Sequence, residues 1–291
     1  MFNGYISAVV SPFDNEEIDT EGYSKYINWL IESGINGIVV SGTTGESASL
    51  TLNEKVRLIE ASKKVIRKRI PLIVGVGSPN TSATLSQVEL INSLDGIDAI
   101  MVVTPFYVKP SQSGICEHFR EISKVSRYPI VIYNNPGRAA VDIGTDTIID
   151  IAKLDNVVAL KEASPDISRF CTLRKALGKG FSLLSGNDDT APAAWAMGAD
   201  GAVSVSANII PSACSEMYKA FKELDFERFS QLRNDYFSIH KLMFREPSPA
   251  PLKYALSLKG FIKEDVRLPL LPLTENTKRI IRDELLRLKE I

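Results

Sequence analysis

The stretch VVALKEAS, residues 157–164, holds an unbroken apolar run that ends in a lysine. A short run of this kind, partly β-branched and bounded by turn-forming residues, predicts a fully buried parallel strand. Lys161 would then lie at the carboxyl end of the strand, where α/β barrels carry their catalytic residues. Because burial disfavours the ammonium form, an amine placed there can be neutral near pH 7 and attack a carbonyl carbon. The alternative is a salt-bridged lysine whose amine reaches solvent.

Further short apolar runs recur along the chain, spaced by roughly 25–35 residues as repeated βα units require. They cover residues 5–12, 37–41, 71–76, 99–104, 129–134, 181–185 and 201–206. Amphipathic segments lie between them, and Asp19, Thr51 and Asn80 are typical helix-starting residues. Eight strands that alternate with helices predict an α/β fold, the (β/α)8 TIM barrel. The alternative, an open doubly wound sheet, usually has a glycine-rich loop after its first strand, and SPFD at residues 11–14 is not one.

The last part of the chain shows no strand-like pattern of apolar residues. Helical patterns extend over residues 212–222, 226–244, 251–258 and 274–289. We therefore expect two domains: a catalytic barrel over residues 1–210 and a C-terminal helical domain, residues 211–291, that packs on the barrel.

Charge, cysteine and histidine content argue against several classes of function. The 34 basic and 35 acidic residues leave a net charge of −1, which gives no electrostatic basis for binding nucleic acid or an anionic membrane. Cys116, Cys171 and Cys214 are far apart and odd in number, as in a reducing cytoplasm. With only His118 and His240, neither a metal site nor a Ser-His-Asp triad is expected. No signal peptide or membrane-spanning stretch is expected either, so we predict a cytoplasmic protein with a small-molecule substrate.

Polar and glycine-rich segments follow several of the predicted strands, at the end where barrels form their active sites. The second strand ends in SGTTGES, residues 41–47, whose glycines let the backbone approach a small anion closely. Tyr107 follows the fourth strand and Tyr133 lies near the end of the fifth, and phenol groups near a reactive lysine can relay protons. Arg138 comes soon afterwards and could hold a carboxylate through two parallel hydrogen bonds. Each feature also has a simpler interpretation: an ordinary turn, half-buried packing or a solvated arginine.

The motifs, taken together, resemble the dihydrodipicolinate synthase and N-acetylneuraminate lyase superfamily of class I aldolases. They are GTTGES at 42–47, TPFY at 104–107, YNNPGR at 133–138, LKEAS at 160–164, SGND at 185–188, FREPSPAPLKYAL at 244–256 and RLPLLPL at 267–273. Within the superfamily, the Thr43-Thr44 pair, Tyr107 and Arg138 are most similar to the dihydrodipicolinate synthases. The resemblance implies a (β/α)8 lyase of lysine (diaminopimelate) biosynthesis that needs no metal or other cofactor.

The resemblance also implies a Schiff-base mechanism centred on Lys161. Its amine would attack C2 of pyruvate, and loss of water would give an imine from which C3 loses a proton to form an enamine. The enamine would add to the aldehyde of L-aspartate 4-semialdehyde, whose amino group then displaces the lysine and closes a ring. The implied proton relay consists of Tyr133, Thr43 and Tyr107, the last reaching across from a partner subunit. The family further implies a homo-oligomer, a tetramer built as a dimer of dimers.

Four substrate-binding residues follow from the same resemblance. Thr44 would hold the pyruvate carboxylate, and Arg138 would hold the carboxylate of the semialdehyde at the site entrance. Gly186 and Val203 would line the pocket. The family usually has Thr-Gly after the arginine, whereas this chain has two alanines at residues 139–140. This departure bears on the choice of the second substrate, because it alters the support of the arginine.

Two other functions are considered. A sister aldolase or dehydratase would act on N-acetylneuraminate or a 2-keto-3-deoxy sugar acid, and Arg138 argues against it because a sugar chain needs hydroxyl partners more than a guanidinium. A non-catalytic barrel that binds a small ligand is the second, and the joint presence of Lys161, Tyr133 and Thr43 argues against it.

Regulation by lysine is expected to be weak or absent. Lysine-inhibited members of the family bind lysine through histidines and a glutamate at a dimer interface. Leu52, Lys55 and Ala83 stand at these positions, and Phe106 replaces a tyrosine. A cation and apolar groups cannot hold an ammonium group.

Overall fold

The structure, a computed structural model, describes residues 2–291. The barrel strands are β1 (Gly4–Ala8), β4 (Gly37–Val40), β5 (Leu72–Val76), β6 (Ala99–Val103), β7 (Ile130–Asn134), β8 (Val157–Glu162), β9 (Ser182–Ser185) and β10 (Gly201–Ser204). They form a closed barrel in the order β1-β10-β9-β8-β7-β6-β5-β4, which confirms the predicted (β/α)8 fold. Each apolar run predicted from the sequence overlaps one of these strands.

The chain divides into two compact units, which we call the central unit and the terminal unit. The central unit comprises residues 2–3 and 71–203, and the terminal unit comprises residues 4–70 and 204–291. Almost every residue of β5 to β9 in the central unit is buried. Parallel strands covered on both faces are apolar throughout, which explains why their sequences are unbroken apolar runs.

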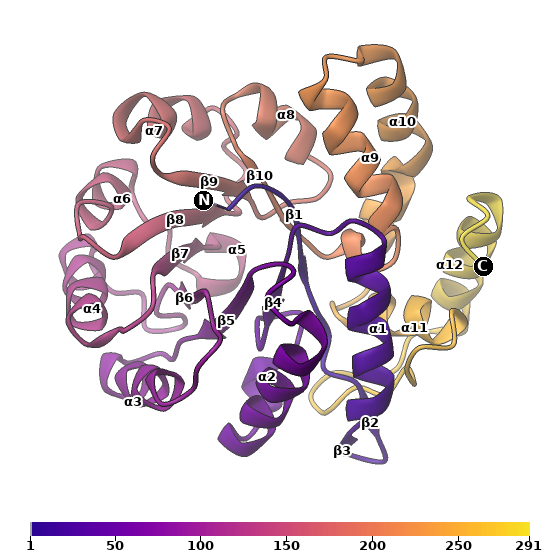
Figure 1. The fold of residues 1–291 in the computed structure, drawn as a ribbon, viewed down its shortest axis with the longest axis horizontal. Coiled ribbons are helices and arrows are strands. Elements are labelled where there is room, and N and C mark those ends of the chain that lie inside the picture. Colours follow the sequence, from indigo (N-terminus) through magenta and orange to yellow (C-terminus); the bar gives the residue numbers. More distant parts are fainter. Residues whose placement is uncertain (1) are drawn as a thin grey trace. The chain divides into compact units, whose positions relative to one another are not determined.

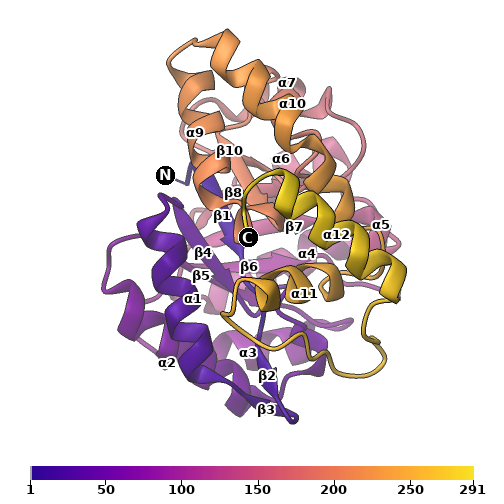
Figure 2. The same ribbon diagram turned by 90° about the vertical axis from the view of Figure 1, so that its right-hand side faces the viewer.

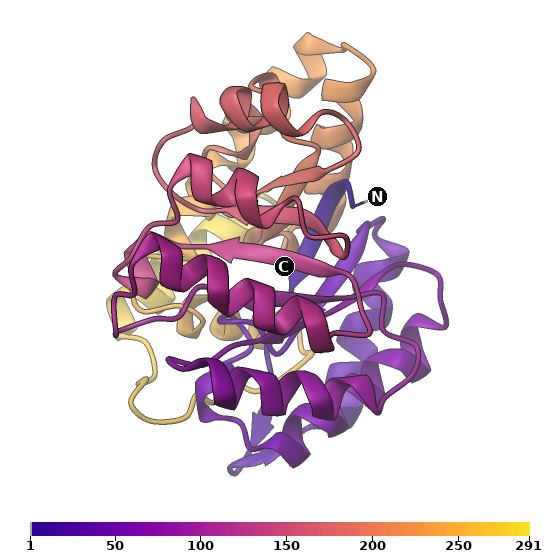
Figure 3. The same cartoon turned by 90° about the vertical axis from the view of Figure 1, so that its left-hand side faces the viewer.

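Helices alternate with the strands of the central unit (Figure 1). They are α3 (Thr81–Asn92), α4 (Gln112–Val125), α5 (Pro136–Ala139), α6 (Thr145–Ile151), α7 (Arg169–Leu177) and α8 (Ala191–Ala196). Figure 3 shows α3, α4, α6 and α7, coloured from purple to pink, lying side by side outside the strands. This arrangement leaves the carboxyl ends of the strands and the segments that follow them to carry functional side chains.

The terminal unit contains β1 and β4 and the remaining helices. They are α1 (Thr20–Glu32), α2 (Leu52–Ile66), α9 (Pro211–Lys222), α10 (Phe226–Leu242), α11 (Ala250–Leu258) and α12 (Glu275–Arg287), with short 3₁₀ turns at η1 (Ser47–Ser49) and η2 (Ser206–Asn208). Helix α9 packs on α10, and α12 packs on both α10 and α11 (Figure 2). The helical character predicted for the C-terminal residues is confirmed, while the domain boundary expected after residue 210 stays a prediction.

The helix starts predicted from the sequence are confirmed at Asp19, Thr51 and Asn80. The side chain of each accepts a hydrogen bond from a backbone N–H three residues further on. At Thr51 the bond is reciprocal, because the Glu54 carboxylate also accepts from the Thr51 backbone N–H at 2.8 Å. These caps satisfy N–H groups that the first turn of a helix otherwise leaves without a partner.

The first strand is shorter than expected. The apolar run over residues 5–12 predicts a strand of that length, but β1 ends at Ala8. The chain then forms a hairpin in which β2 (Phe13–Asp14) pairs antiparallel with β3 (Glu17–Ile18). Pro12 has no N–H to donate to a strand neighbour, and the hairpin turns through two residues of positive φ, Asn15 and Glu16.

Neither a membrane span nor a metal centre is found in the described chain. No helix among residues 2–291 has both the length and the apolar character needed to cross a bilayer. Over the same residues, no group of three or more His, Cys, Asp or Glu side chains is arranged to hold a metal ion. Cys116, Cys171 and Cys214 take part in no disulfide bond.

His118 on α4 makes stability depend on pH below neutrality. Its side chain is buried, its Nδ1 lies 3.0 Å from the Thr81 hydroxyl, and burial lowers its pKa to about 4. The unfolded chain takes up this proton near pH 6.5, so folding should lose stability as the pH falls from about 6.5 to about 4, by roughly 3 kcal/mol in all. Urea unfolding of wild type and His118→Gln across this range measures the effect. We expect the free energy of unfolding to fall less steeply with decreasing pH in the variant than in wild type. Identical slopes for the two proteins would contradict the assignment to His118.

Candidate active site

Lys161 and Tyr133 lie side by side at the carboxyl ends of β8 and β7. The two residues are register partners in the parallel pairing of these strands, so their side chains emerge on the same face. The Lys161 Nζ lies 4.2 Å from the centre of the Tyr133 ring. Both residues are buried, with 7% and 5% of their surface exposed. The structure therefore brings together two of the catalytic residues predicted from the sequence.

Gly186, directly after β9, leaves room for the Lys161 side chain. A Cβ added at Gly186 would lie 3.2 Å from Lys161 Cε and 2.7 Å from Ala163 Cβ. The Gly186 N–H donates to the Glu162 carbonyl at 2.7 Å, which holds the backbone close to the lysine. A side chain at this position would crowd Ala163 and Lys161, so Gly186 leaves space beside the lysine. Its predicted contribution of backbone to the pocket lining stays a prediction. Val203, also predicted to line the pocket, is buried on β10.

Asn135 holds the Tyr133 phenol, a contact that sequence reasoning did not identify. Its side-chain amide donates to the Tyr133 hydroxyl oxygen at 2.9 Å. The amide oxygen of the same residue accepts from the Arg138 backbone N–H at 3.2 Å and caps the short helix α5. The YNNPGR motif thus folds so that one asparagine orients the tyrosine and starts the helix that carries the arginine.

A buried polar network supports the ends of β7 and β8. The Asn134 amide donates to both Glu162 carboxylate oxygens at 3.0 Å and to Asp142 at 2.7 Å. Arg169 donates to Glu162 at 3.0 Å and to Asp142 through two nitrogens, at 3.0 and 2.7 Å. The Glu162 side chain is fully buried and that of Arg169 is 10% exposed. Because Asn134 and Glu162 directly follow Tyr133 and Lys161, the network fixes the backbone that carries both residues.

The charges of this network stabilise one another. The hydrogen bond from Arg169 to Asp142 raises the pKa of the guanidinium, against the effect of burial. Burial alone would raise the pKa of the Asp142 carboxyl, but hydrogen bonds from Arg169 and Asn134 lower it overall. Both groups are thus held in their charged forms. Consecutive strand residues face opposite sides of a sheet, so the Asn134 and Glu162 side chains point away from the face that carries Tyr133 and Lys161.

Arg138 lies on α5 with its side chain exposed. No ion pair engages its guanidinium within residues 2–291, so its charge is available to a ligand. The two alanines that follow it are well accommodated. Ala139 is buried and its carbonyl accepts from the Tyr107 backbone N–H at 3.2 Å, and Ala140 ends the helix with a φ of 59°. The turn that carries Arg138 is therefore tied to the loop that carries Tyr107.

Tyr107 is held in an exposed position. Its φ is +73°, unusual for an aromatic residue, and 84% of its surface is exposed. A ring so exposed makes few contacts within its own chain, so it does not pack against Lys161 and Tyr133 as those two pack together.

The GTTGES segment of the terminal unit forms a compact turn after β4. The N–H groups of Gly45 and Ser47 both donate to the Gly42 carbonyl, at 3.1 and 3.3 Å. Gly45 lies against the segment that follows β1, where an added Cβ would be 3.1 Å from the Val9 carbonyl oxygen, and its own carbonyl accepts from the Ser11 hydroxyl at 2.6 Å. Thr43 is exposed on this turn and Thr44 is buried. A tight turn of this kind presents hydroxyl and N–H groups in fixed directions.

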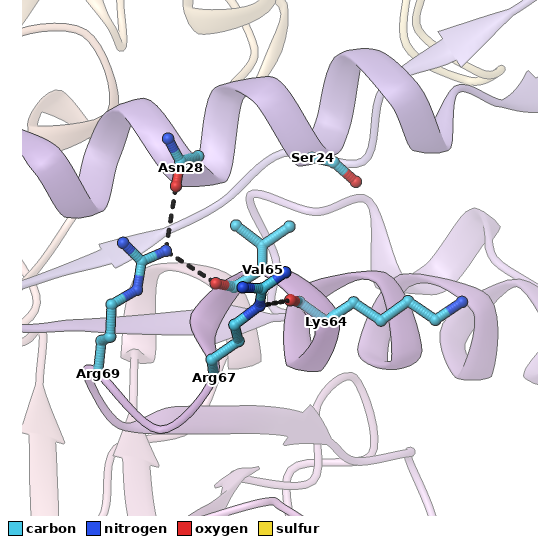
Figure 4. Close-up of a pocket in the computed structure, with 6 residues that line it drawn as sticks. All are labelled: Ser24, Asn28, Lys64, Val65, Arg67 and Arg69. Atoms are coloured by element: carbon cyan, nitrogen blue, oxygen red, sulfur yellow. Dashed lines mark hydrogen bonds between the residues drawn. The ribbon is translucent and has the colours of Figure 1, made fainter.

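A basic hollow elsewhere in the terminal unit has a structural explanation. It measures about 430 Å³, lies between α1 and the end of α2, and is lined by Ser24, Asn28, Lys64, Val65, Arg67 and Arg69 (Figure 4). Arg69 donates to the Asn28 side chain at 3.0 Å and to the Val65 carbonyl at 2.8 Å, and Arg67 donates to the Lys64 carbonyl at 3.1 Å. The arginines thus satisfy carbonyl groups at the helix end, where cations are favourable.

The sequence matches the model of the Dihydrodipicolinate synthetase family over residues 1–287. The chain belongs to this family.

Relatives named 4-hydroxy-tetrahydrodipicolinate synthase match over the whole chain. The protein of Bartonella bacilliformis is 39% identical over 283 residues, which cover 97% of this chain and 96% of the relative. That of Rhodospirillum centenum is 40% identical over 287 residues, which cover 99% and 98%. The crystal structure of the dihydrodipicolinate synthase from Thermotoga maritima has a TM-score of 0.97 at 36% identity, with complete coverage of both chains. That of the chloride-inhibited enzyme from Acinetobacter baumannii, complexed with pyruvate, has a TM-score of 0.96 at 36% identity, again with complete coverage.

Membership of the dihydrodipicolinate synthetase family establishes the class of reaction. The protein is a lyase of the class I aldolase type with the function of a 4-hydroxy-tetrahydrodipicolinate synthase in lysine (diaminopimelate) biosynthesis. Enzymes of the family use pyruvate as a substrate. The relatives do not favour the alternative of an aldolase for N-acetylneuraminate or 2-keto-3-deoxy sugar acids.

Proposed function

We propose that Lys161 forms a Schiff base with pyruvate and that the resulting enamine condenses with L-aspartate 4-semialdehyde. The observation that carries this proposal is the buried amine of Lys161, 4.2 Å from the centre of the Tyr133 ring and beside a glycine where a side chain would crowd Ala163 and the lysine. A lysine enclosed in this way can attack a carbonyl while a neighbouring phenol transfers protons.

The proposed reaction balances in four steps. The Lys161 amine attacks C2 of pyruvate, and protonation of the oxygen lets it leave as water, which gives a protonated imine. The imine draws electrons from C3, which loses a proton and becomes the nucleophilic carbon of an enamine. This carbon attacks the aldehyde of the semialdehyde, whose oxygen takes up a proton. The substrate amino group then attacks the imine carbon, which closes the ring. The bond to Lys161 breaks, and the lysine leaves as a free amine.

Proton transfer in these steps is assigned to three hydroxyl groups. Tyr133, Thr43 and Tyr107 each carry an O–H that can both donate and accept. The Asn135 amide, which donates to the Tyr133 oxygen, supports the orientation that a relay requires. The exposure of Tyr107 and its positive φ support a contribution to a partner subunit, and thus a homo-oligomer. A tetramer built as a dimer of dimers is proposed from the family resemblance alone.

Substrate binding is assigned to the remaining residues of the set. Thr44 binds the pyruvate carboxylate through its hydroxyl and backbone N–H groups of the turn. Gly186 and Val203 line the pocket, the first by leaving space beside Lys161 and the second with apolar surface.

Weak or absent lysine feedback stays a prediction.

Arg138 should determine affinity for the second substrate. Replacement by lysine keeps the charge but loses the bidentate geometry for a carboxylate, so the KM for the semialdehyde should rise about 10- to 100-fold. The KM for pyruvate should stay within about twofold, because pyruvate is held elsewhere. Steady-state kinetics with each substrate varied in turn measure both values. Ala140→Gly, which changes the same turn without touching the guanidinium, serves as control. Equal increases in both KM values in the Arg138 variant would contradict this role.

The proposed second substrate is tested by turnover of pyruvate with L-aspartate 4-semialdehyde, coupled to the NADPH-dependent reductase that consumes the product. We expect NADPH oxidation that requires both substrates. In parallel, borohydride reduction in the presence of pyruvate should add the mass of a reduced pyruvate adduct. An adduct without turnover would keep the Schiff base and refute the second substrate, and sugar-derived 2-keto acids would then be assayed.

A further inference from the structure

Glu46 lies buried in the turn that carries Thr43 and Thr44. Its φ is 50°, and its side chain is 1% exposed. The Glu46 N–H donates to the Thr43 carbonyl at 3.0 Å, which ties the backbone of Glu46 to that of Thr43. A buried carboxylate must find partners, because transfer of a charge out of water is unfavourable unless that charge is paired.

Lys253 on α11 supplies the charge that pairs with this carboxylate. Its Nζ lies 2.5 Å from Glu46 Oε1 and donates to the Asp265 carbonyl at 2.7 Å. The same ammonium lies 3.9 Å from the centre of the Phe13 ring, and the lysine is fully buried. Because the lysine is fully buried, its ammonium is stabilised by its contacts with Glu46, the Asp265 carbonyl and the aromatic face.

Arg267 provides a second attachment from the C-terminal region. Its backbone N–H donates to Glu46 Oε2 at 3.0 Å. Its guanidinium donates to the Ser49 carbonyl at 2.9 Å and forms an ion pair with Glu54 at 2.5 Å. Both ends of the 46–54 segment are therefore bound by residues of the two C-terminal motifs, 244–256 and 267–273. None of the proposed catalytic or substrate-binding residues lies in these motifs.

We propose that Lys253 and Arg267 act as positioning residues for pyruvate binding by holding Glu46 and, through it, the Thr43-Thr44 turn. This inference rests on the proposed role of that turn in binding the pyruvate carboxylate. It gives the C-terminal helical region an indirect function in the reaction, because Lys253 on α11 supplies the cation that holds the turn in place.

The alternative is that the Glu46–Lys253 pair contributes only to stability. The two roles differ in what they change. A purely stabilising pair alters the fraction of folded enzyme and hence the maximal extent of adduct formation, whereas a positioning pair alters the pyruvate concentration needed for half of that extent.

The test uses the full-length Lys253→Met variant, which removes the ammonium at similar length. Borohydride trapping at increasing pyruvate concentration, read by mass spectrometry, gives the half-saturating concentration for wild type and variant. We expect this concentration to rise about tenfold or more in the variant, while saturating pyruvate still gives the adduct. The double variant Glu46→Ala/Lys253→Met leaves no unpaired buried charge, and it should show the same rise if the single variant does not fold.

Lys259→Met is the matched control. Lys259 lies in the same C-terminal region, is 11% exposed and forms an ion pair with Glu290 at 3.0 Å, but it does not touch the turn. Its half-saturating concentration should stay within about twofold of wild type. A wild-type value in a folded Lys253 variant, or an equal rise in the Lys259 variant, would overturn the positioning role alone. Absence of any pyruvate adduct in wild type would instead refute the proposed function and this inference with it.

Discussion

Replacement of Lys161 by alanine is expected to lower the turnover of pyruvate with L-aspartate 4-semialdehyde by about 10⁴-fold or more. The variant lacks the amine that forms the imine, and without an imine the C3 proton of pyruvate is not acidified. The Tyr133 ring, 4.2 Å from the amine in wild type, remains to bind and transfer protons but has no covalent intermediate to act on. Turnover coupled to NADPH oxidation measures the loss.

The covalent step is checked separately by mass. Borohydride reduction with pyruvate should modify wild type at Lys161 and leave Lys161→Ala unmodified. Lys153→Ala is the control, because Lys153 is 70% exposed and pairs with the exposed Asp150, so both turnover and adduct should persist. An adduct on the Lys161 variant, or turnover close to wild type, would mean that another amine carries the reaction.

Replacement of Arg169 by methionine is expected to lower the free energy of unfolding by about 3–5 kcal/mol. The change leaves the fully buried Glu162 carboxylate without its cation and removes the two donors to Asp142. Uncompensated buried charge is among the most destabilising results of a single substitution. Urea unfolding at one fixed protein concentration measures the effect, since assembly would shift the midpoint with concentration.

Two further variants separate charge from packing at this position. Arg127→Met removes an arginine from the exposed pair with Asp95 and should cost no more than about 1 kcal/mol. Glu162→Gln combined with Arg169→Met removes both buried charges and should recover part of the loss. Destabilisation by Arg169→Met of less than about 1 kcal/mol would show that the network does not support β7 and β8 as described.

Much of the fold was predictable because its signals are local. Each apolar run became a strand, since a parallel strand covered on both faces must be apolar along its length. The helix starts at Asp19, Thr51 and Asn80 were predictable because a capping side chain acts only a few residues away. The first strand was predicted too long, because apolar character alone does not show where pairing stops and the 13–18 hairpin begins.

The candidate site was predictable only in part. Lys161 and Tyr133 could be placed at neighbouring strand ends, because the order of strands in a barrel follows the chain. The network of Asn134, Asp142, Glu162 and Arg169 was not foreseen, because its members come from separate segments and any of them alone resembles a surface residue.

The sequence by itself thus determined the barrel and the class of reaction and supplied the prediction that Lys161 is the reactive residue, because periodicity, capping and motif spacing are written in consecutive residues. Only the tertiary structure decided which charges are buried together. Glu46 and Lys253 are far apart in the chain, and each is a charged residue of a type that is usually exposed to solvent. Their pairing at 2.5 Å depends on how the segments pack, since burial and electrostatic strength are properties of the surroundings rather than of the residue type.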